Sequence, residues 1–200
     1  MSKRPFFLLA IFGALIFVSG CAHDPRTDSR TQYLTAMGGA SAQQRAPFDN
    51  VSFWDGEGVS GSPSVLISLG EQRAYFYKGN ELVGVSLIST GREGLETPTG
   101  KFKIIQKDKD HKSSQFGDYI DAQGGIIKKE VDVKVDPKPP GAIFDGAKMP
   151  YFMRIVGGTG MHAGFLPGYP ASHGCIRMPE FMAEAFFRNI SVGVPVTISR

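Results

Sequence analysis

One cysteine and two histidines lie close together near the C-terminal end of this 200-residue chain. Cys175 lies in the stretch 172–177, which reads SHGCIR, and His162 lies thirteen positions upstream of it. A thiol with a pKa of about 8.5 is only slightly ionised at neutral pH, so a nucleophilic cysteine needs a base beside it. An imidazole can lower the pKa of the thiol and later return the proton to a leaving group. The pattern therefore indicates a cysteine nucleophile with a histidine partner.

The residues alone leave the identity of the base open. His162 lies on an expected strand and could fold back onto the thiol. His173 lies two positions before Cys175, and side chains at i and i+2 of an extended segment share a face. Gly174 allows the backbone to approach a reacting carbonyl group closely. The amides of Gly174 and Cys175 are candidate oxyanion donors, each worth roughly 3–4 kcal/mol in other enzymes.

Two other interpretations of these residues do not involve a nucleophile. A cysteine can be a buried, unreactive core residue. A zinc site built from Cys175, His162 and His173 lacks a fourth ligand, and the spacing fits no standard zinc finger. The remaining histidines, His23 and His111, lie in polar segments elsewhere in the chain. We therefore expect neither a metal nor another cofactor.

The N-terminus resembles a bacterial lipoprotein signal. Lys3 and Arg4 precede an almost wholly apolar run over 5–17, which has the length of a signal-peptide core and is short for a bilayer span. Residues 18–21 read VSGC, which resembles a lipobox whose cysteine is lipidated after cleavage. The sequence predicts a signal peptide over 1–20 and a lipid on Cys21; the alternatives are an ordinary secretory signal or an uncleaved anchor. Ala22 favours the outer membrane if the cell is Gram-negative.

The rest of the chain is expected to form a tether and one domain in the cell envelope, facing the periplasm from its lipid anchor. Residues 21–50 are polar and form either a flexible tether or a surface-packed arm. Residues 51–200 are enough for one domain with a core of its own. A lipidated Cys21 leaves Cys175 without a disulfide partner. Removal of Lys3 and Arg4 lowers the formal charge from +3 to +1, which gives no case for nucleic-acid binding.

Short apolar runs separated by turn residues predict a mainly β fold, a sandwich or barrel with one or two short helices. A hairpin turn is expected at 78–81, which reads KGNE. One helix is expected from Pro179, with an apolar stripe of Phe181, Met182, Ala185 and Phe186. The expected strands cover 64–69, 73–77, 82–88, 101–106, 151–156, 159–163 and 195–198.

A polar, charged segment over 107–140 interrupts this pattern. Residues 126–127 and 131–135 alternate as strands do. The segment is either a flap over the site, which would influence acceptor specificity, or a solvated protruding hairpin with no contact to substrate.

The cysteine motif, with a histidine thirteen positions before it, is similar to the signature of the L,D-transpeptidase (YkuD-type) catalytic domain. The similarity extends over about 62–199, and the blocks that carry it read STG at 89–91, TPTGKF at 97–102, MHAG at 161–164 and GVPV at 193–196. The resemblance implies a β-sandwich-like fold and a reaction on peptidoglycan stem peptides. Two departures are the short gap between His162 and Cys175 and the long segment 107–140.

By this resemblance, Cys175 attacks the carbonyl that joins the diamino acid of a tetrapeptide stem to its terminal D-alanine. D-Alanine leaves, and an amine acceptor then takes the acyl group from the thioester. The acceptor is a second stem, a wall-attached protein, or a D-amino acid. His162 matches the histidine that takes and returns the proton, with a backbone carbonyl near Ala163 orienting it. His173 matches a supporting histidine.

Three further residues receive less specific roles. Ser172 and Arg177 are expected to order the loop or meet substrate, and a surface salt bridge is the alternative for Arg177. Tyr151 is expected either to line the substrate groove or to be a core aromatic residue. Two other functions fit the same residues: an L,D-carboxypeptidase or cross-link hydrolase that uses water, and a non-catalytic wall-binding lipoprotein.

Overall fold

The computed structural model describes residues 49–200. The predicted signal peptide over 1–20, Cys21 and nearly all of the predicted tether over 21–50 lie outside the described residues. Among residues 49–200, no helix has the length and apolar character needed to cross a membrane.

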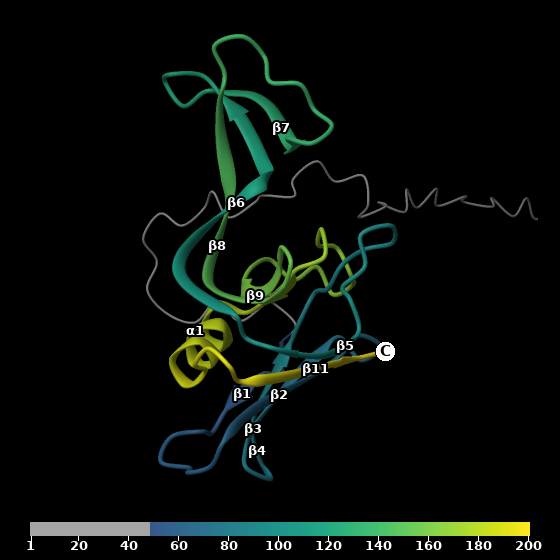
Figure 1. Ribbon diagram of the computed structural model, residues 1–200, viewed down its shortest axis with the longest axis vertical. Helices are drawn as coiled ribbons and strands as arrows, with labels where there is room; N and C mark the ends of the chain where they lie inside the picture. Colours follow the sequence, from purple (N-terminus) through teal and green to yellow (C-terminus); the bar gives the residue numbers. More distant parts are fainter. Residues whose placement is uncertain (1–48) are drawn as a thin grey trace, which may run out of the picture. The chain divides into compact units, whose positions relative to one another are not determined.

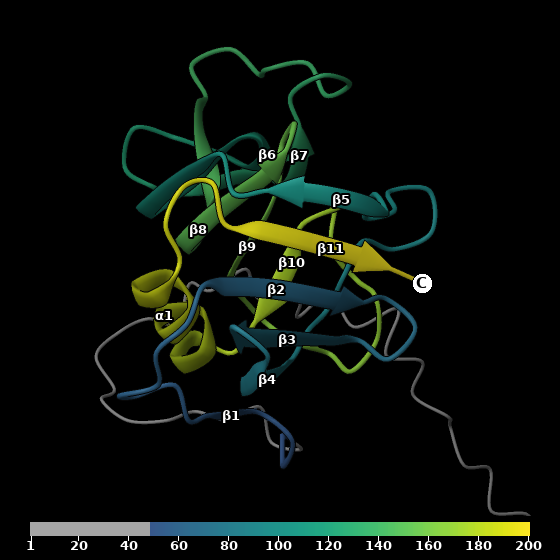
Figure 2. The ribbon, with the colours of Figure 1, turned by 60° about the horizontal axis from the view of Figure 1, so that its bottom comes forward.

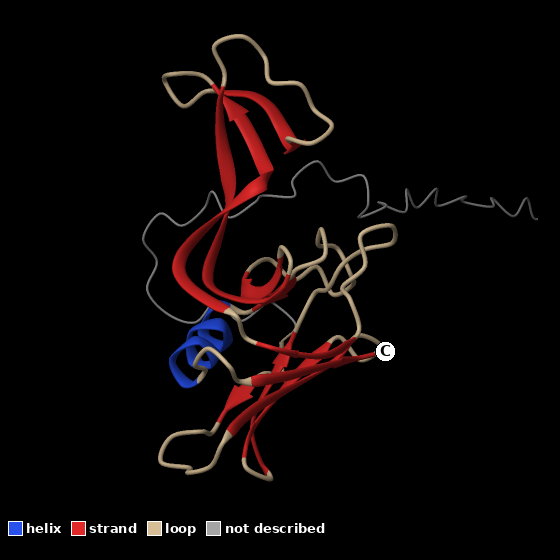
Figure 3. Ribbon diagram, viewed as in Figure 1, coloured by secondary structure: helices blue, strands red, loops and turns tan. Residues whose placement is uncertain are grey.

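Two β-sheets and one helix form this part of the chain (Figures 1 and 3). The first sheet has the order β1-β4-β3-β2-β11-β5, which Figure 2 shows strand by strand. Its strands are β1 (Phe53–Trp54), β2 (Pro63–Ser68), β3 (Arg73–Lys78), β4 (Glu81–Leu87), β5 (Gly100–Lys103) and β11 (Pro195–Ser199). The prediction of a mainly β fold is confirmed, and the two sheets do not close into a barrel.

The second sheet has the order β10-β9-β8-β6-β7. Its strands are β6 (Gln106–Ile120), β7 (Ile126–Asp132), β8 (Ile143–Val156), β9 (Thr159–Ala163) and β10 (Ile176–Met178). The helix α1 (Glu180–Asn189) follows β10 directly, after Pro179 as its N-cap residue. The hairpin turn predicted at 78–81 joins β3 to β4, and Gly79 adopts the positive φ of 61° that such a turn requires.

Alternating side chains of both sheets fill one apolar core. Met161 and Ala163 of β9 are buried in it, as are Ile176 and Met178 of β10. Because successive strand residues point to opposite faces, the residues between them must project from the other face of the sheet. That other face carries the candidate site.

The helix closes one side of this core. Phe186 of α1 meets Phe76 and Trp54 of the first sheet, with ring centroids 5.0 Å and 6.0 Å away. The predicted apolar stripe was right for Met182 and Phe186, whereas Ala183 is buried in place of Ala185. The buried face is therefore rotated slightly from the stripe that the sequence indicated.

One predicted strand ends early. The strand expected over 101–106 stops at Lys103, where its pairing with β11 becomes irregular: the Ile104 amide bonds to the Val194 carbonyl, whereas the Ile104 carbonyl accepts from Gly193. The chain then enters β6 of the other sheet at Gln106. This crossing connects the two sheets at the base of the polar segment.

The segment 107–140 projects from the domain on two long strands (Figure 1). The outer halves of β6 and β8 continue beyond the rest of their sheet and carry β7. Tyr119, Val131 and Ala142 form a small separate core there, with Phe144 packed against it. Of the two expected forms, the protruding hairpin is present, with a third strand added.

The aromatic contacts of Phe186 predict a large loss of stability on truncation. Phe186→Ala should lower the free energy of unfolding by about 3–5 kcal/mol, because it removes a fully buried ring and leaves a cavity. Chemical denaturation followed by circular dichroism measures this. Phe181→Ala, at a partly buried position of the same helix, should cost clearly less; equal losses would contradict the packing described.

Candidate active site

The outward face of β9 and β10 brings two predicted site residues side by side. The two strands pair in parallel, with His162 opposite Arg177. Both side chains are almost fully buried, at 5% and 9% exposure. Phe152 of β8 lies next to them, with its ring centroid 6.3 Å from that of His162. The face away from the core is therefore also covered, by aromatic and polar residues.

The loop before β10 is held by the hydroxyl of Ser172. Its oxygen accepts a hydrogen bond from the Gly174 amide at 3.1 Å, and its proton goes to the Cys175 carbonyl. Gly174 has a φ of 107°, a conformation that other residues rarely adopt. The loop-ordering role predicted for Ser172 agrees with these contacts.

This arrangement also bears on the predicted oxyanion donors. The Gly174 amide is already committed to Ser172, so the structure does not favour it as a donor to substrate. The role of the Cys175 amide stays a prediction.

Thr97 is a positioning residue that the sequence argument did not single out. Its hydroxyl accepts from the Gly91 amide at 2.9 Å and donates to the Gly174 carbonyl at 3.0 Å. The side chain is 4% exposed, so both bonds are shielded from water. The TPTGKF block at 97–102 contained this residue, but a block match does not reveal that its hydroxyl reaches a loop 77 positions away.

A second link ties the segment after β4 to the site. Ser89 and Arg177 exchange two backbone hydrogen bonds, each 2.9 Å long. The buried hydroxyl of Ser89 donates to the carbonyl of Tyr169 in the loop between β9 and β10. The STG block at 89–91 thus anchors the loop that leads to Cys175 at Tyr169 and the strand that follows it at Arg177.

Burial and a neighbouring carbonyl group favour the protonated form of the Cys175 thiol. Its Sγ lies 3.6 Å from the Gly158 carbonyl oxygen, to which only a protonated thiol can donate. Burial raises the pKa of Cys175 above its ordinary value, against smaller lowering effects of the Gly160 amide and of Arg177 and Arg154. Within residues 49–200, no hydrogen bond joins Sγ to either candidate imidazole.

His162 is a neutral imidazole with a defined tautomer. Its Nδ1 lies 2.8 Å from the Ala163 carbonyl oxygen, so Nδ1 carries the hydrogen and Nε2 keeps a lone pair. The pKa of His162 is lowered to about 4, mainly by burial; the Ala163 contact opposes this shift, and the charges of Arg177 and His111 contribute to it. The orientation by Ala163 that the resemblance implied is present.

His173 is neutral as well, with the same tautomer. Arg92 Nη1 lies 3.0 Å from its Nε2, and a guanidinium can only donate, so Nε2 is the acceptor. The pKa of His173 is lowered to about 4, mainly by burial and also by the charges of Arg92 and Arg177, while Asp132 opposes this shift. Because its Nε2 is occupied, His173 is the weaker candidate for the base.

Arg177 links the three titratable groups. Its positive charge lowers the pKa of Cys175, of His162 and of His173. Its aliphatic part lies against Gly164, where a Cβ atom would come within 2.9 Å of its Cγ. With 9% exposure it is not the surface residue that one prediction allowed.

Tyr151 is not brought to this cluster. Its ring packs on Phe187 of α1 at 5.8 Å and belongs to the side of the sheet that faces the core. Burial, followed by the charges of Glu184 and Glu180, raises its pKa. This position agrees with the core-aromatic alternative. The described residues also contain no cluster of three or more potential metal ligands.

The chain belongs to the L,D-transpeptidase catalytic-domain family, YkuD. The model of this family matches residues 62–198, which is more than half of the chain. A search of curated protein sequences gave no match.

Solved structures share the fold. An L,D-transpeptidase from Mycobacterium smegmatis is 17% identical over 70% of this chain and 59% of its own, with a TM-score of 0.51. One from Stackebrandtia nassauensis is also 17% identical, over 78% of this chain and 62% of its own, with a TM-score of 0.51. The match thus spans about three fifths of those two proteins, and at this identity it shows the fold.

The contacts of Thr97 predict that its hydroxyl matters more than its volume. Thr97→Val should lower the free energy of unfolding by about 1–3 kcal/mol, because it leaves a buried amide and carbonyl without partners. Thr97→Ser keeps the hydroxyl and should retain most of the stability. Urea denaturation compares them, and equal losses in both variants would contradict the role of the hydroxyl.

The raised pKa of Cys175 predicts slow alkylation at neutral pH. Reaction with iodoacetamide should accelerate about tenfold per pH unit from pH 7 to pH 9, because the thiolate fraction rises tenfold per unit below the pKa. Peptide mass spectrometry separates Cys175 from Cys21. Unfolded protein serves as the control with an ordinary thiol. A rate already constant from pH 6 upwards would indicate a resting thiolate and contradict this assignment.

Proposed function

We propose that this protein is a peptidoglycan L,D-transpeptidase with Cys175 as nucleophile and His162 as general base. The observation that carries the proposal is the state of His162: a buried, neutral imidazole whose Nδ1–H is bound to Ala163 and whose Nε2 has a lone pair. This side chain projects from the same face of the sheet as Arg177, two residues after Cys175. Membership of the L,D-transpeptidase family supplies the reaction class.

The first half-reaction forms a thioester. The thiol turns from the Gly158 carbonyl by rotation about its χ1 torsion and gives its proton to His162 Nε2. The sulfur attacks the carbonyl carbon between the diamino acid and the terminal D-alanine of a tetrapeptide stem. The tetrahedral intermediate collapses, the C–N bond breaks, and His162 returns the proton to the departing amine of D-alanine.

The second half-reaction reverses these roles with a new amine. The acceptor amine attacks the thioester carbon while His162 Nε2 takes one of its protons. The C–S bond breaks, and this proton restores the thiol. Arg177 favours the thiolate in both halves, since its positive charge lowers the thiol pKa. Water in place of the amine would give hydrolysis by the same residues.

Purified tetrapeptide muropeptides test the proposal. The protein without its first 21 residues should release D-alanine and form cross-linked dimers, as followed by liquid chromatography and mass spectrometry. Cys175→Ala should reduce this by more than about 1,000-fold and His162→Gln by about 100-fold or more. Full D-alanine release by Cys175→Ala would contradict the mechanism. Tripeptides without dimers would instead identify a hydrolase.

A second measurement is independent of the acceptor. Carbapenem treatment should add the mass of one drug molecule to the intact protein, because the thiol opens the lactam ring and stays acylated. Cys175→Ala should gain no mass. Matched Cys21→Ser protein should still be acylated, which assigns the adduct to Cys175.

We also propose that a lipid on Cys21 anchors the protein in the cell envelope, facing the periplasm, where stem peptides are within reach. Support comes from the lipobox-like sequence over 18–21. In a Gram-negative host, the protein should sediment with outer membranes, whereas Cys21→Ser should appear in the soluble periplasmic fraction. An unchanged membrane fraction would contradict the lipid anchor.

A further inference from the structure

The projecting segment reaches the candidate site through Phe116. The ring of Phe116, on β6, stacks on the imidazole of His173 with centroids 4.3 Å apart and planes 26° apart. This stacking connects the outer part of β6 to the loop that carries Cys175. The geometry of β6 explains how this contact arises.

A bulge in β6 aims Phe116 at His173. Lys112 pairs with Lys148, and the next pair outward is Gly117 with Gly146. This step takes five residues on β6 but only two on β8, so the extra residues of β6 loop out of the ladder. The hydroxyl of Ser113 closes the loop by accepting from the Phe116 amide at 2.9 Å.

Two glycines permit the close strand approach at the bulge. A Cβ atom on Gly117 would collide with the Asp145 carbonyl oxygen, and one on Gly146 would collide with that of Ser113. The two strands therefore approach each other more closely here than larger residues would allow. The chain at 113–116 is displaced from the ladder at this point, on the side where His173 lies.

The neighbouring strand β7 holds Phe116 in place and adds a charge. Asp132 is the register partner of Phe116, and both of its carboxylate oxygens accept from Gln115 Nε2 at 3.1 Å. The amide of Val133 donates to the Gln115 carbonyl at 3.0 Å. Strand β7 therefore holds Gln115, and with it the adjacent Phe116, through a backbone hydrogen bond and through side-chain hydrogen bonds.

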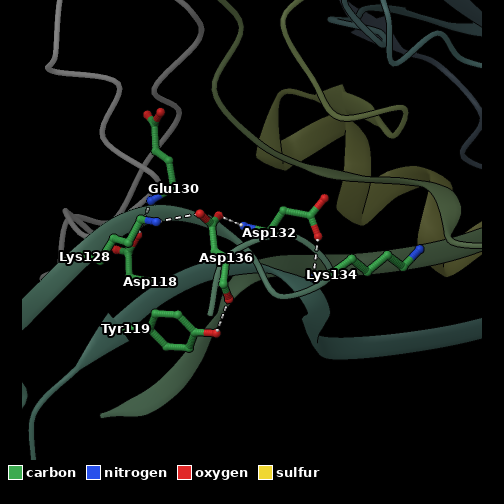
Figure 4. Close-up of polar contacts among 7 residues, drawn as sticks. All are labelled: Asp118, Tyr119, Lys128, Glu130, Asp132, Lys134 and Asp136. Carbon is green, nitrogen blue, oxygen red and sulfur yellow. Dashed lines mark hydrogen bonds and ion pairs between the residues drawn. The ribbon is translucent and has the colours of Figure 1, made fainter. Parts of the chain in front are cut away.

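The position of Asp132 is fixed by hydrogen bonds within residues 132–136 (Figure 4). Its amide donates to the Asp136 carboxylate, which also pairs with Lys128. Its carboxylate accepts from the Lys134 amide at 3.0 Å, and the Tyr119 hydroxyl donates to the Asp136 carbonyl. The position of Asp132 is therefore determined by the segment itself.

We propose that Phe116 is a positioning residue of the active site, which acts by covering one face of His173 and holding that ring against Arg92. The projecting segment is then a wall of the site. The charged groups around His173 are Arg92 after β4, Arg177 on β10 and Asp132 on β7, so this wall supplies the only negative charge among them. Without Phe116, water reaches the ring, and Asp132 favours its protonation.

This proposal predicts a change at His173 that a purely structural role would not produce. Protonation of His173 would replace the acceptor Nε2 with a donor and repel Arg92, so the ring would leave its fixed orientation. At pH 5.5 the wild-type ring should be neutral with its hydrogen on Nδ1. In Phe116→Ala a substantial fraction should be protonated at that pH.

Nitrogen-15 NMR of the histidine rings in the intact chain reports both protonation and tautomer. Comparison with His173→Gln assigns the resonance. Phe116→Trp restores an aromatic face and should return the wild-type spectrum. Phe53→Ala removes an exposed phenylalanine of β1 in the other sheet and is the matched control. If Phe116→Ala does not fold, Phe116→Leu offers the same comparison with most of the apolar volume kept.

The kinetic arm rests on the proposed function. D-Alanine release by Phe116→Ala should lose about 10-fold to 100-fold in kcat with a smaller change in KM, because release of the His173 ring loosens the loop that carries Cys175 while substrate contacts remain. Unchanged ring resonances in both Phe116→Ala and Phe116→Leu would overturn the proposal. A wild-type protein without D-alanine release would overturn the proposed function instead, and the NMR result would still decide the role of Phe116.

Discussion

The parallel pairing of β9 with β10 is the constraint on which the site depends. Each strand buries every second residue in the core, so His162 and Arg177 are forced onto the opposite face and into register with each other. A slip of one residue would exchange the faces, placing a histidine in the core and a methionine beside the cysteine. The apolar core therefore does more than stabilise the fold, since it also fixes which side chains surround Cys175.

Hydroxyl groups, and not cross-links, hold the loop that carries Cys175. The Ser172 hydroxyl accepts from the Gly174 amide and donates to the Cys175 carbonyl. The Thr97 hydroxyl donates to the Gly174 carbonyl, and the Ser89 hydroxyl donates to the Tyr169 carbonyl in the loop after β9. These three side chains are 4% exposed or less, so water does not compete for their bonds. A network of this kind keeps the backbone rigid while leaving the thiol chemically available.

The sequence was most informative where function depends on neighbours in the chain. The cysteine motif, the Gly79 turn and the helix after Pro179 are short-range patterns, and their positions agree with the structure. Arg92, Thr97 and Phe116 are different, because they reach the loop from strands or turns 57 to 81 positions away. Hydrophobic periodicity carries no information about such contacts.

The polar segment shows the same limit. Its alternating residues correctly indicated strands, but the choice between flap and solvated hairpin depended on a bulge. That bulge brings the strands so close at Gly117 and Gly146 that no side chain would fit, and an isolated glycine in a strand pattern signals only that some irregularity is present. The segment is a protruding hairpin whose Phe116 ring stacks on His173, and its contact with substrate stays a prediction.

The electrostatics of the site favour a neutral thiol and neutral imidazoles at rest, and they favour loss of a proton from a protonated imidazole. Burial makes charge costly for the thiol and for both imidazoles, so the resting state is neutral. Arg177 acts differently on the two kinds of group, because its charge stabilises a thiolate and destabilises a protonated imidazole. A proton taken by His162 is therefore held weakly and passes readily to a departing amine. In the proposed reaction, the cation that stabilises the thiolate also makes the protonated His162 a better acid toward the departing amine.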